Sequence, residues 1–175
     1  FFFTLKMQDG AAQGDDTSAE QPPSSATVLP SSGAGELFFH HRLNLLVVDD
    51  NMINLKVVRG FIDKIGIECT TSSSGHEALD MLENGTFSAV LLDLQLPDMN
   101  GIEITELIRK HQRPAVAEIP VIAFTGNTSD EDMESCRIAG MNDFIPKPIS
   151  FEKLVDILQK SDGQHDFLWP LESQP

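Results

Sequence analysis

The sequence of 175 residues contains no tyrosine, one tryptophan and only two cysteines. Without tyrosine, no phenol hydroxyl is available for catalysis or for hydrogen bonding. Cys69 and Cys136 are isolated and form no Cys-x-x-Cys spacing. We therefore expect both thiols to be reduced and buried as small hydrophobic side chains in a cytoplasmic protein.

Basic side chains are also scarce, because 12 lysines and arginines stand against 27 aspartates and glutamates, for a net charge of −15. This balance argues against a general nucleic-acid binder, which needs basic side chains to neutralise phosphates, and against direct contact with an anionic membrane surface. No apolar run approaches the roughly 20 residues of a membrane-spanning helix. The hydrophobic fraction of 41% is ample for one buried core.

The composition divides the chain into four parts. Residues 1–7 are apolar and begin with Phe, so we expect the chain to be a piece of a longer protein. Residues 8–42 lack hydrophobic periodicity and are largely Gly, Ser, Pro, Ala and Gln, which is typical of a flexible linker. Residues 43–160 form one domain, and residues 161–175 form a polar C-terminal tail that we expect to fray.

Within residues 43–160, short apolar runs of strand length alternate with helical patterns. The predicted strands are residues 43–48, 67–71, 87–92, 120–124 and 143–145. The predicted helices cover residues 53–65, 76–84 and 102–108, a segment from a capping box at 128–131 to residue 140, and residues 151–158. Gly66 and Gly85 are expected to end the first two helices.

Five strand–helix units with continuously apolar strands indicate a parallel sheet that helices cover on both faces. Right-handed crossovers leave few topologies for such a chain. We predict an α/β fold with a flavodoxin-like, doubly wound, five-stranded parallel sheet of strand order 2-1-3-4-5. Ligands of such sheets bind at the carboxyl ends of the strands.

Polar residues follow four of the predicted strands at these ends. Asp49 and Asp50 follow the first strand, Asp93 the third, Thr125 the fourth and Lys147 the fifth. Carboxylates gathered this closely repel one another unless a cation lies among them, and oxygen ligands in a strand-end cleft favour Mg²⁺. A metal, a lysine, a hydroxyl donor and a carboxylate nucleophile together indicate a phosphoryl-transfer site that forms an acyl phosphate.

These residues lie in four motifs: VVDDN at 47–51, LLDLQLPDMNG at 91–101, AFTGN at 123–127 and GMNDFIPKP at 140–148. With these motifs, the segment 43–160 resembles a response-regulator receiver domain of two-component signalling. The resemblance implies that Asp93 is the phosphoacceptor. It also implies that Asp50 and Asp93 bind Mg²⁺ directly, that Asp49 acts mainly through water, and that the backbone carbonyl of Gln95 completes the protein ligands.

The resemblance implies roles for three further residues. Thr125 would hydrogen-bond the phosphoryl group, and Lys147 would pair with it. Phe144 occupies the place of the family's aromatic switch residue, and because phenylalanine has no hydroxyl, the switch would be purely steric. The peptide bond between Lys147 and Pro148 is expected to be cis.

The segment FFFTLKM at residues 1–7 resembles the last strand of a histidine kinase ATP-binding domain. Followed by a linker and a receiver, it suggests the C-terminal part of a hybrid sensor histidine kinase, which could be membrane-anchored elsewhere. In such proteins the receiver takes a phosphoryl group from a phosphohistidine and relays it to a histidine phosphotransfer protein. The segment would then be a phosphoacceptor module and not itself a kinase.

Other functions share parts of this pattern. A haloacid-dehalogenase-type phosphatase also uses an aspartate nucleophile and Mg²⁺, but its Asp-x-Asp pattern is absent after the first strand, where Asp49 and Asp50 are adjacent. A receiver-like interaction module would act by docking without phosphorylation, and the complete set of site residues argues against it. A flavodoxin-like FMN carrier is disfavoured because no phosphate-binding loop follows the first strand.

Overall fold

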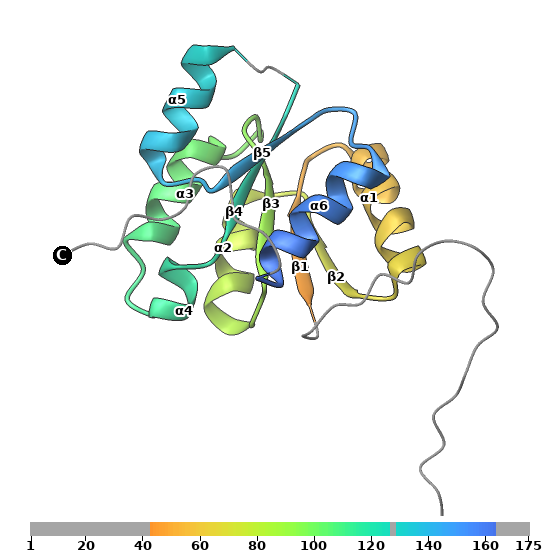
Figure 1. Ribbon diagram of the computed structural model, residues 1–175. Coiled ribbons are helices and arrows are strands. Elements are labelled where there is room, and N and C mark those ends of the chain that lie inside the picture. Colours follow the sequence, from red (N-terminus) through yellow and green to blue (C-terminus); the bar gives the residue numbers. More distant parts are fainter. Residues whose placement is uncertain (1–42, 127–128, 164–175) are drawn as a thin grey trace, which may run out of the picture. The chain divides into compact units, whose positions relative to one another are not determined.

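The computed structural model describes residues 43–126 and 129–163 (Figure 1). The expected kinase strand and linker at residues 1–42 lie outside the described residues, as does the tail from residue 164 onward. None of the helices in the described ranges is long and apolar enough to cross a membrane.

Five strands form one parallel sheet in the order β2-β1-β3-β4-β5, as predicted. Their bounds are Asn44–Val48 for β1, Glu68–Ser72 for β2, Ala89–Asp93 for β3, Val121–Thr125 for β4 and Asp143–Pro146 for β5. Every residue of β3 and β4 is buried, which explains why their sequences are almost continuously apolar. The edge strand β2 is more polar, and only its last residue, Ser72, is buried.

Six helices lie in the described part of the chain. They are α1 (Met52–Ile65), α2 (Gly75–Asn84), α3 (Gly101–Arg109), α4 (Pro114–Ala117), α5 (Asp130–Ala139) and α6 (Phe151–Ser161). The sequence pattern predicted all of them except α4, because four residues are too few to show a helical period. The available signal was Pro114 in the first turn, where the missing N–H costs no hydrogen bond.

The helix ends follow the residues that flank them. Gly66 and Gly140 adopt the left-handed conformation, with φ of 79° and 93°, and end α1 and α5 as predicted. The start of α5 differs from the predicted capping box. Ser129 is the N-cap, one residue later than predicted, and its Oγ accepts a hydrogen bond from the backbone N–H of Asp132 at 3.2 Å.

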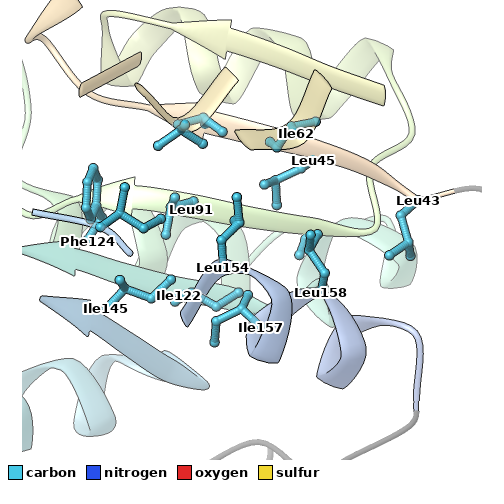
Figure 2. Packing of buried hydrophobic residues seen from close by; sticks show 14 of the residues in the cluster. Leu43, Leu45, Ile62, Leu91, Ile122, Phe124, Ile145, Leu154, Ile157 and Leu158 are labelled. Carbon is cyan, nitrogen blue, oxygen red and sulfur yellow. The ribbon is translucent and has the colours of Figure 1, made fainter. Parts of the chain in front are cut away.

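Two hydrophobic layers, one on each face of the sheet, hold the helices in place. α1 and α6 cover one face, where Ile62 and Leu154 belong to the same buried cluster as Leu45 and Leu91 (Figure 2). α2, α3 and α5 cover the other face, where Ile104 is fully buried. Each fully buried aliphatic side chain in these layers contributes about 1.5–3 kcal/mol. With both faces covered, the carboxyl ends of the strands are left for polar residues.

The two cysteines are free thiols. Cys136 is buried in the layer of α2, α3 and α5, as expected, whereas Cys69 on the edge strand β2 is only half-buried. Burial nevertheless raises the pKa of Cys69 to about 11. Its thiol therefore stays protonated and weakly reactive at neutral pH.

Candidate functional site

The carboxyl ends of β1 and β3 bring three aspartates together. Asp49 and Asp50 directly follow β1, and Asp93 is the last residue of β3. One carboxylate oxygen from each of the three lies within 4.8 Å of the others. Asp49 and Asp93 are buried and Asp50 is exposed, so Asp50 is the member of the cluster that reaches solvent.

The ammonium group of Lys147 contacts both buried aspartates. Its Nζ atom lies 2.5 Å from Oδ2 of Asp93 and 2.7 Å from Oδ2 of Asp49. The backbone N–H of Lys147 donates to the carbonyl of Thr125 at 2.8 Å, which continues the pairing of β4 with β5. The bond from Lys147 to Pro148 is cis, as expected. One positive charge thus faces two buried negative charges.

Burial raises the pKa of Asp93, because its carboxylate loses hydration in this environment. Lys147 and the backbone N–H of Gln95, which donates to Oδ1 at 3.1 Å, act in the opposite direction and favour the ionised form. The negative charge of Asp49 adds repulsion. A further positive charge would stabilise the cluster, since Lys147 offsets only one of its negative charges.

Four polar contacts hold the carboxylate of Asp49. Its Oδ1 accepts hydrogen bonds from the backbone N–H of Asn51 at 2.8 Å and from Nδ2 of Asn54 at 3.1 Å. Its Oδ2 accepts a second contact from the same Nδ2 at 2.9 Å and pairs with Lys147. Sequence reasoning did not single out Asn54. The only signal was its place in the first turn of the helix that follows the aspartate pair.

The loop after β3 is fixed at both ends. A β-bridge pairs Gln95 with Asn100, and the N–H of Gly101 donates to the carbonyl of Leu94 at 3.0 Å. A Cβ atom at Gly101 would lie 2.5 Å from the backbone oxygen of Asp93, so a larger residue requires the backbone to move. The carbonyl of Gln95, a predicted metal ligand, therefore lies in a loop of defined shape.

Asp98 connects this loop to the start of α2. Its carboxylate accepts hydrogen bonds from the backbone N–H groups of His76 and Gly75 at 3.0 and 3.1 Å and from Oγ of Ser74 at 2.8 Å, and Nδ1 of His76 lies 2.9 Å away. These bonds, the two backbone ones above all, hold the pKa of Asp98 well below its usual range. Asp98 thus acts as a second cap for α2, and its negative charge is favourable at a helix N-terminus.

Thr125 and Phe144 lie on the two strands beyond β3. Thr125 is the buried last residue of β4, the strand next to β3. Phe144 is half-buried in β5, pairs in register with Ala123, and packs against the layer that α2, α3 and α5 cover. Both residues stand at the strand positions that the sequence predicted, and their roles in phosphoryl transfer stay predictions.

The donor set of this cluster fits a hard divalent cation. The three aspartates offer only carboxylate oxygens, which favour Mg²⁺ over the metals that prefer sulfur or nitrogen. Mg²⁺ in proteins is usually bound through one or two carboxylates and keeps several waters. Two carboxylates of the cluster are buried and that of Asp50 is exposed, so an ion bound here can contact carboxylates and still keep waters.

The family model of the response regulator receiver domain matches residues 45–159. Hybrid signal transduction histidine kinase L of Dictyostelium discoideum is 35% identical over 127 residues, which cover 69% of this chain and 7% of that protein. Signal transduction histidine-protein kinase BarA of Escherichia coli K12 is 35% identical over 132 residues, which cover 75% of this chain and 14% of that protein. The chain therefore corresponds to a small part of each of these relatives.

Solved structures share the fold. The receiver domain of sensor histidine kinase PA1611 from Pseudomonas aeruginosa, described with magnesium coordinated in its active site cleft, is 32% identical with a TM-score of 0.64. That match covers 70% of this chain and 99% of the other. A co-crystal structure of the Saccharomyces cerevisiae histidine phosphotransfer protein Ypd1 with the receiver domain of Ssk1 matches at 27% identity and a TM-score of 0.64, over 73% of this chain and 93% of the other.

Proposed function

Because the chain belongs to the response regulator receiver domain family, we propose that it is the phosphoacceptor module of a two-component phosphorelay and that Asp93 carries the phosphoryl group. The observation that carries this proposal is the contact of Lys147 with Asp93 and Asp49 in a cluster of three aspartates. A carboxylate nucleophile, a cationic side chain and a set of oxygen ligands are the parts that phosphoryl transfer uses. The matched relatives support a hybrid histidine kinase as the parent protein.

In the proposed reaction, a carboxylate oxygen of Asp93 attacks the phosphorus of a phosphohistidine on another protein or domain. A P–O bond forms while the P–N bond breaks, and the electron pair of the broken bond becomes a lone pair on the imidazole nitrogen. The products are an aspartyl phosphate and a histidine that is neutral when its other ring nitrogen carries the proton. Lys147 stabilises the negative charge on the phosphoryl oxygens, and the hydroxyl of Thr125 donates a hydrogen bond to one of them.

Asp50, Asp93 and the backbone carbonyl of Gln95 would hold Mg²⁺, and Asp49 would act on it through water. When bound, the ion neutralises charge on the phosphoryl oxygens and relieves the repulsion among the aspartates. The chain itself contributes the positions of these groups, since the start of α1 fixes Asp49 and the loop after β3 fixes Gln95.

The proposed output is a change in the surface formed by α5, β5 and α6. Thr125 moves toward the phosphoryl group, and Phe144 turns into the space that Thr125 leaves. β4 and β5 pair in register, from Ile122 opposite Asp143 to Thr125 opposite Pro146, so a movement at the end of β4 reaches β5 directly. The phosphoryl group thereby biases the domain between two conformations.

The proposed partners are a phosphohistidine donor and a histidine phosphotransfer protein that takes the phosphoryl group onward. The structure that contains Ypd1 supports this class of partner. α1 begins two residues after Asp50 and exposes Met52 and Ile53 in its first turn, with 58% and 70% of their surface accessible. Apolar side chains exposed beside a polar site favour a protein contact at this place, and we infer that the histidine-bearing partner docks there.

Incubation of the chain with Mg²⁺ and acetyl phosphate, followed by intact-mass measurement, tests the proposal. We expect the wild type to gain the mass of one phosphoryl group and Asp93→Asn to gain none. An interaction module that docks without phosphorylation would gain no mass in either protein. Addition that persists in Asp93→Asn would place the acceptor elsewhere and contradict the proposal.

A further inference from the structure

Asn54, in the first turn of α1, contacts both oxygens of the Asp49 carboxylate. Its Nδ2 atom lies 3.1 Å from Oδ1 and 2.9 Å from Oδ2. At these distances one N–H of the amide is shared between the two oxygens as a bifurcated hydrogen bond. The orientation of the amide follows from its neighbour, because the amide oxygen would meet a carboxylate if the group were reversed. Asn54 therefore fixes both the position and the rotation of the carboxylate.

Three protein donors use most of the acceptor capacity of the Asp49 carboxylate. An ionised carboxylate offers about four acceptor sites. Asn51 N–H contacts Oδ1, Lys147 contacts Oδ2, and the Asn54 amide is shared between the two oxygens. The carboxylate of Asp49 is therefore held mainly by protein donors and keeps capacity for a metal-bound water. Direct binding of an ion is then left to Asp50, which is exposed, and to Asp93, the last residue of β3.

We propose that Asn54 is a positioning residue that sets the affinity of the aspartate cluster for Mg²⁺ through its hold on Asp49. The inference rests on the proposed function, because it concerns the same magnesium site. Without the amide, Asp49 keeps only the Asn51 N–H on one oxygen and Lys147 on the other, so its charge is held less tightly relative to Asp50 and Asp93. Loss of such an outer contact typically costs 10- to 100-fold in metal affinity or activity.

The test compares Asn54→Leu with Asn51→Ala by calorimetric titration with MgCl₂. Leucine has the same branching at Cγ and removes the donor. Asn51→Ala is the matched control: it removes the side-chain cap of α1, whose Oδ1 accepts from Ile53 N at 2.9 Å, but keeps the backbone N–H that contacts Asp49. We expect the Kd for Mg²⁺ to rise about tenfold or more in Asn54→Leu. In the control we expect a change of less than about twofold, because its contacts to Asp49 are intact.

A second readout separates positioning from loss of structure. At saturating Mg²⁺, Asn54→Leu should be phosphorylated by acetyl phosphate at a rate within a few-fold of the wild type, because the nucleophile and Lys147 are unchanged. Asn54→Ala serves in its place if circular dichroism shows that the leucine variant does not fold. A wild-type Kd in the Asn54 variants would overturn the inference, and so would an equal loss in Asn51→Ala. Failure of the proposed function is read separately, as absence of acetyl phosphate labelling in the wild type, and leaves the comparison of Mg²⁺ affinities intact.

Discussion

The Nζ atom of Lys147 lies 2.5 Å from Oδ2 of Asp93, although 54 residues separate the two in the sequence. The contact depends on the parallel sheet, because Asp93 ends β3 and Lys147 follows β5, with β4 between the two strands. The ammonium group favours the ionised form of a buried carboxylate, which is the nucleophilic form, and the same positive charge is available to an incoming phosphoryl group.

Removal of this charge should weaken both the fold and the chemistry. Lys147→Met leaves Asp49 and Asp93 buried without their shared cation. We expect the free energy of unfolding in Mg²⁺-free buffer to fall by about 1–3 kcal/mol, as for buried polar groups left unpaired. Urea denaturation measures this loss, and acetyl phosphate labelling should slow by about tenfold or more.

Lys110→Met is the matched control for this experiment. Lys110 forms an exposed ion pair with Glu106 at 3.2 Å on the surface of α3. Such pairs contribute about 0–1 kcal/mol, and Lys110 does not contact the aspartates, so we expect little change in stability or labelling. Equal losses in the two lysine variants would contradict the role given to Lys147.

Asp93→Asn should change stability in a pH-dependent way. Burial raises the pKa of Asp93 in the folded protein. The contribution of this carboxyl group to stability is therefore present below its pKa in the unfolded chain, and it is lost as pH rises through its pKa in the folded protein. In Mg²⁺-free buffer at pH 7, the asparagine variant should therefore be more stable than the wild type. The difference should vanish below about pH 4, as shown by thermal unfolding across that range.

Mg²⁺ should reverse the order of stability and make the wild type more stable than Asp93→Asn. An ion that binds the folded wild type raises its stability by about 2.7 kcal/mol when its concentration is 100 times the Kd. Asp93→Asn, which lacks one of the proposed ligands, should gain less. A thermal shift with MgCl₂ that is as large in the variant as in the wild type would show that the ion binds elsewhere.

Asp98 should stabilise the domain at neutral pH and lose this effect in acid. Its pKa in the folded protein is held low by the N–H groups of His76 and Gly75, so its contribution is present above the unfolded pKa and is lost as pH falls through the folded pKa. We expect Asp98→Asn to cost about 1 kcal/mol at pH 7, as for loss of a helix cap. The difference from the wild type should begin to narrow below about pH 4. A difference that is constant from pH 7 into acid would contradict the account.

Docking at the start of α1 should matter for phosphoryl transfer from another protein but not for transfer from a small molecule. Ile53→Asn removes the apolar side chain from the exposed first turn of α1 and adds no charge beside the aspartates. We expect phosphoryl exchange with a histidine phosphotransfer protein to slow by about tenfold, as for loss of an interface anchor of about 1.4 kcal/mol, with labelling by acetyl phosphate unchanged. Ile138→Asn, at a similarly exposed residue near the C-terminal end of α5, is the control and should affect neither rate.

The sheet and most of the site could be predicted because their signals are local. Apolar runs of strand length located β1, β3 and β4, and the rule that ligands bind at strand ends singled out Asp49, Asp93 and Lys147. The structure brings these residues into contact. Their assignment to individual roles came from the resemblance to receiver domains, because neighbouring aspartates cannot be distinguished by spacing alone.

The features that sequence reasoning missed depend on contacts between elements. Asn54 reads as an ordinary polar residue in a helical turn until the structure shows its amide on Asp49. Asp98 reads as a loop residue, although it caps α2 from a position 22 residues away from His76. The predicted N-cap of α5 was one residue too early, because two consecutive hydroxyl residues can both fill this role and the structure uses Ser129.

The most direct test of the central claim locates the phosphoryl group after transfer from a phosphorylated histidine phosphotransfer protein in the presence of Mg²⁺. Borohydride reduces an aspartyl phosphate to homoserine, which peptide mass spectrometry identifies at a single position. We predict homoserine at residue 93 in the wild type and none in samples treated with EDTA before transfer. Homoserine at another aspartate, or an unmodified Asp93 after the donor has lost its phosphoryl group to this chain, would contradict the account.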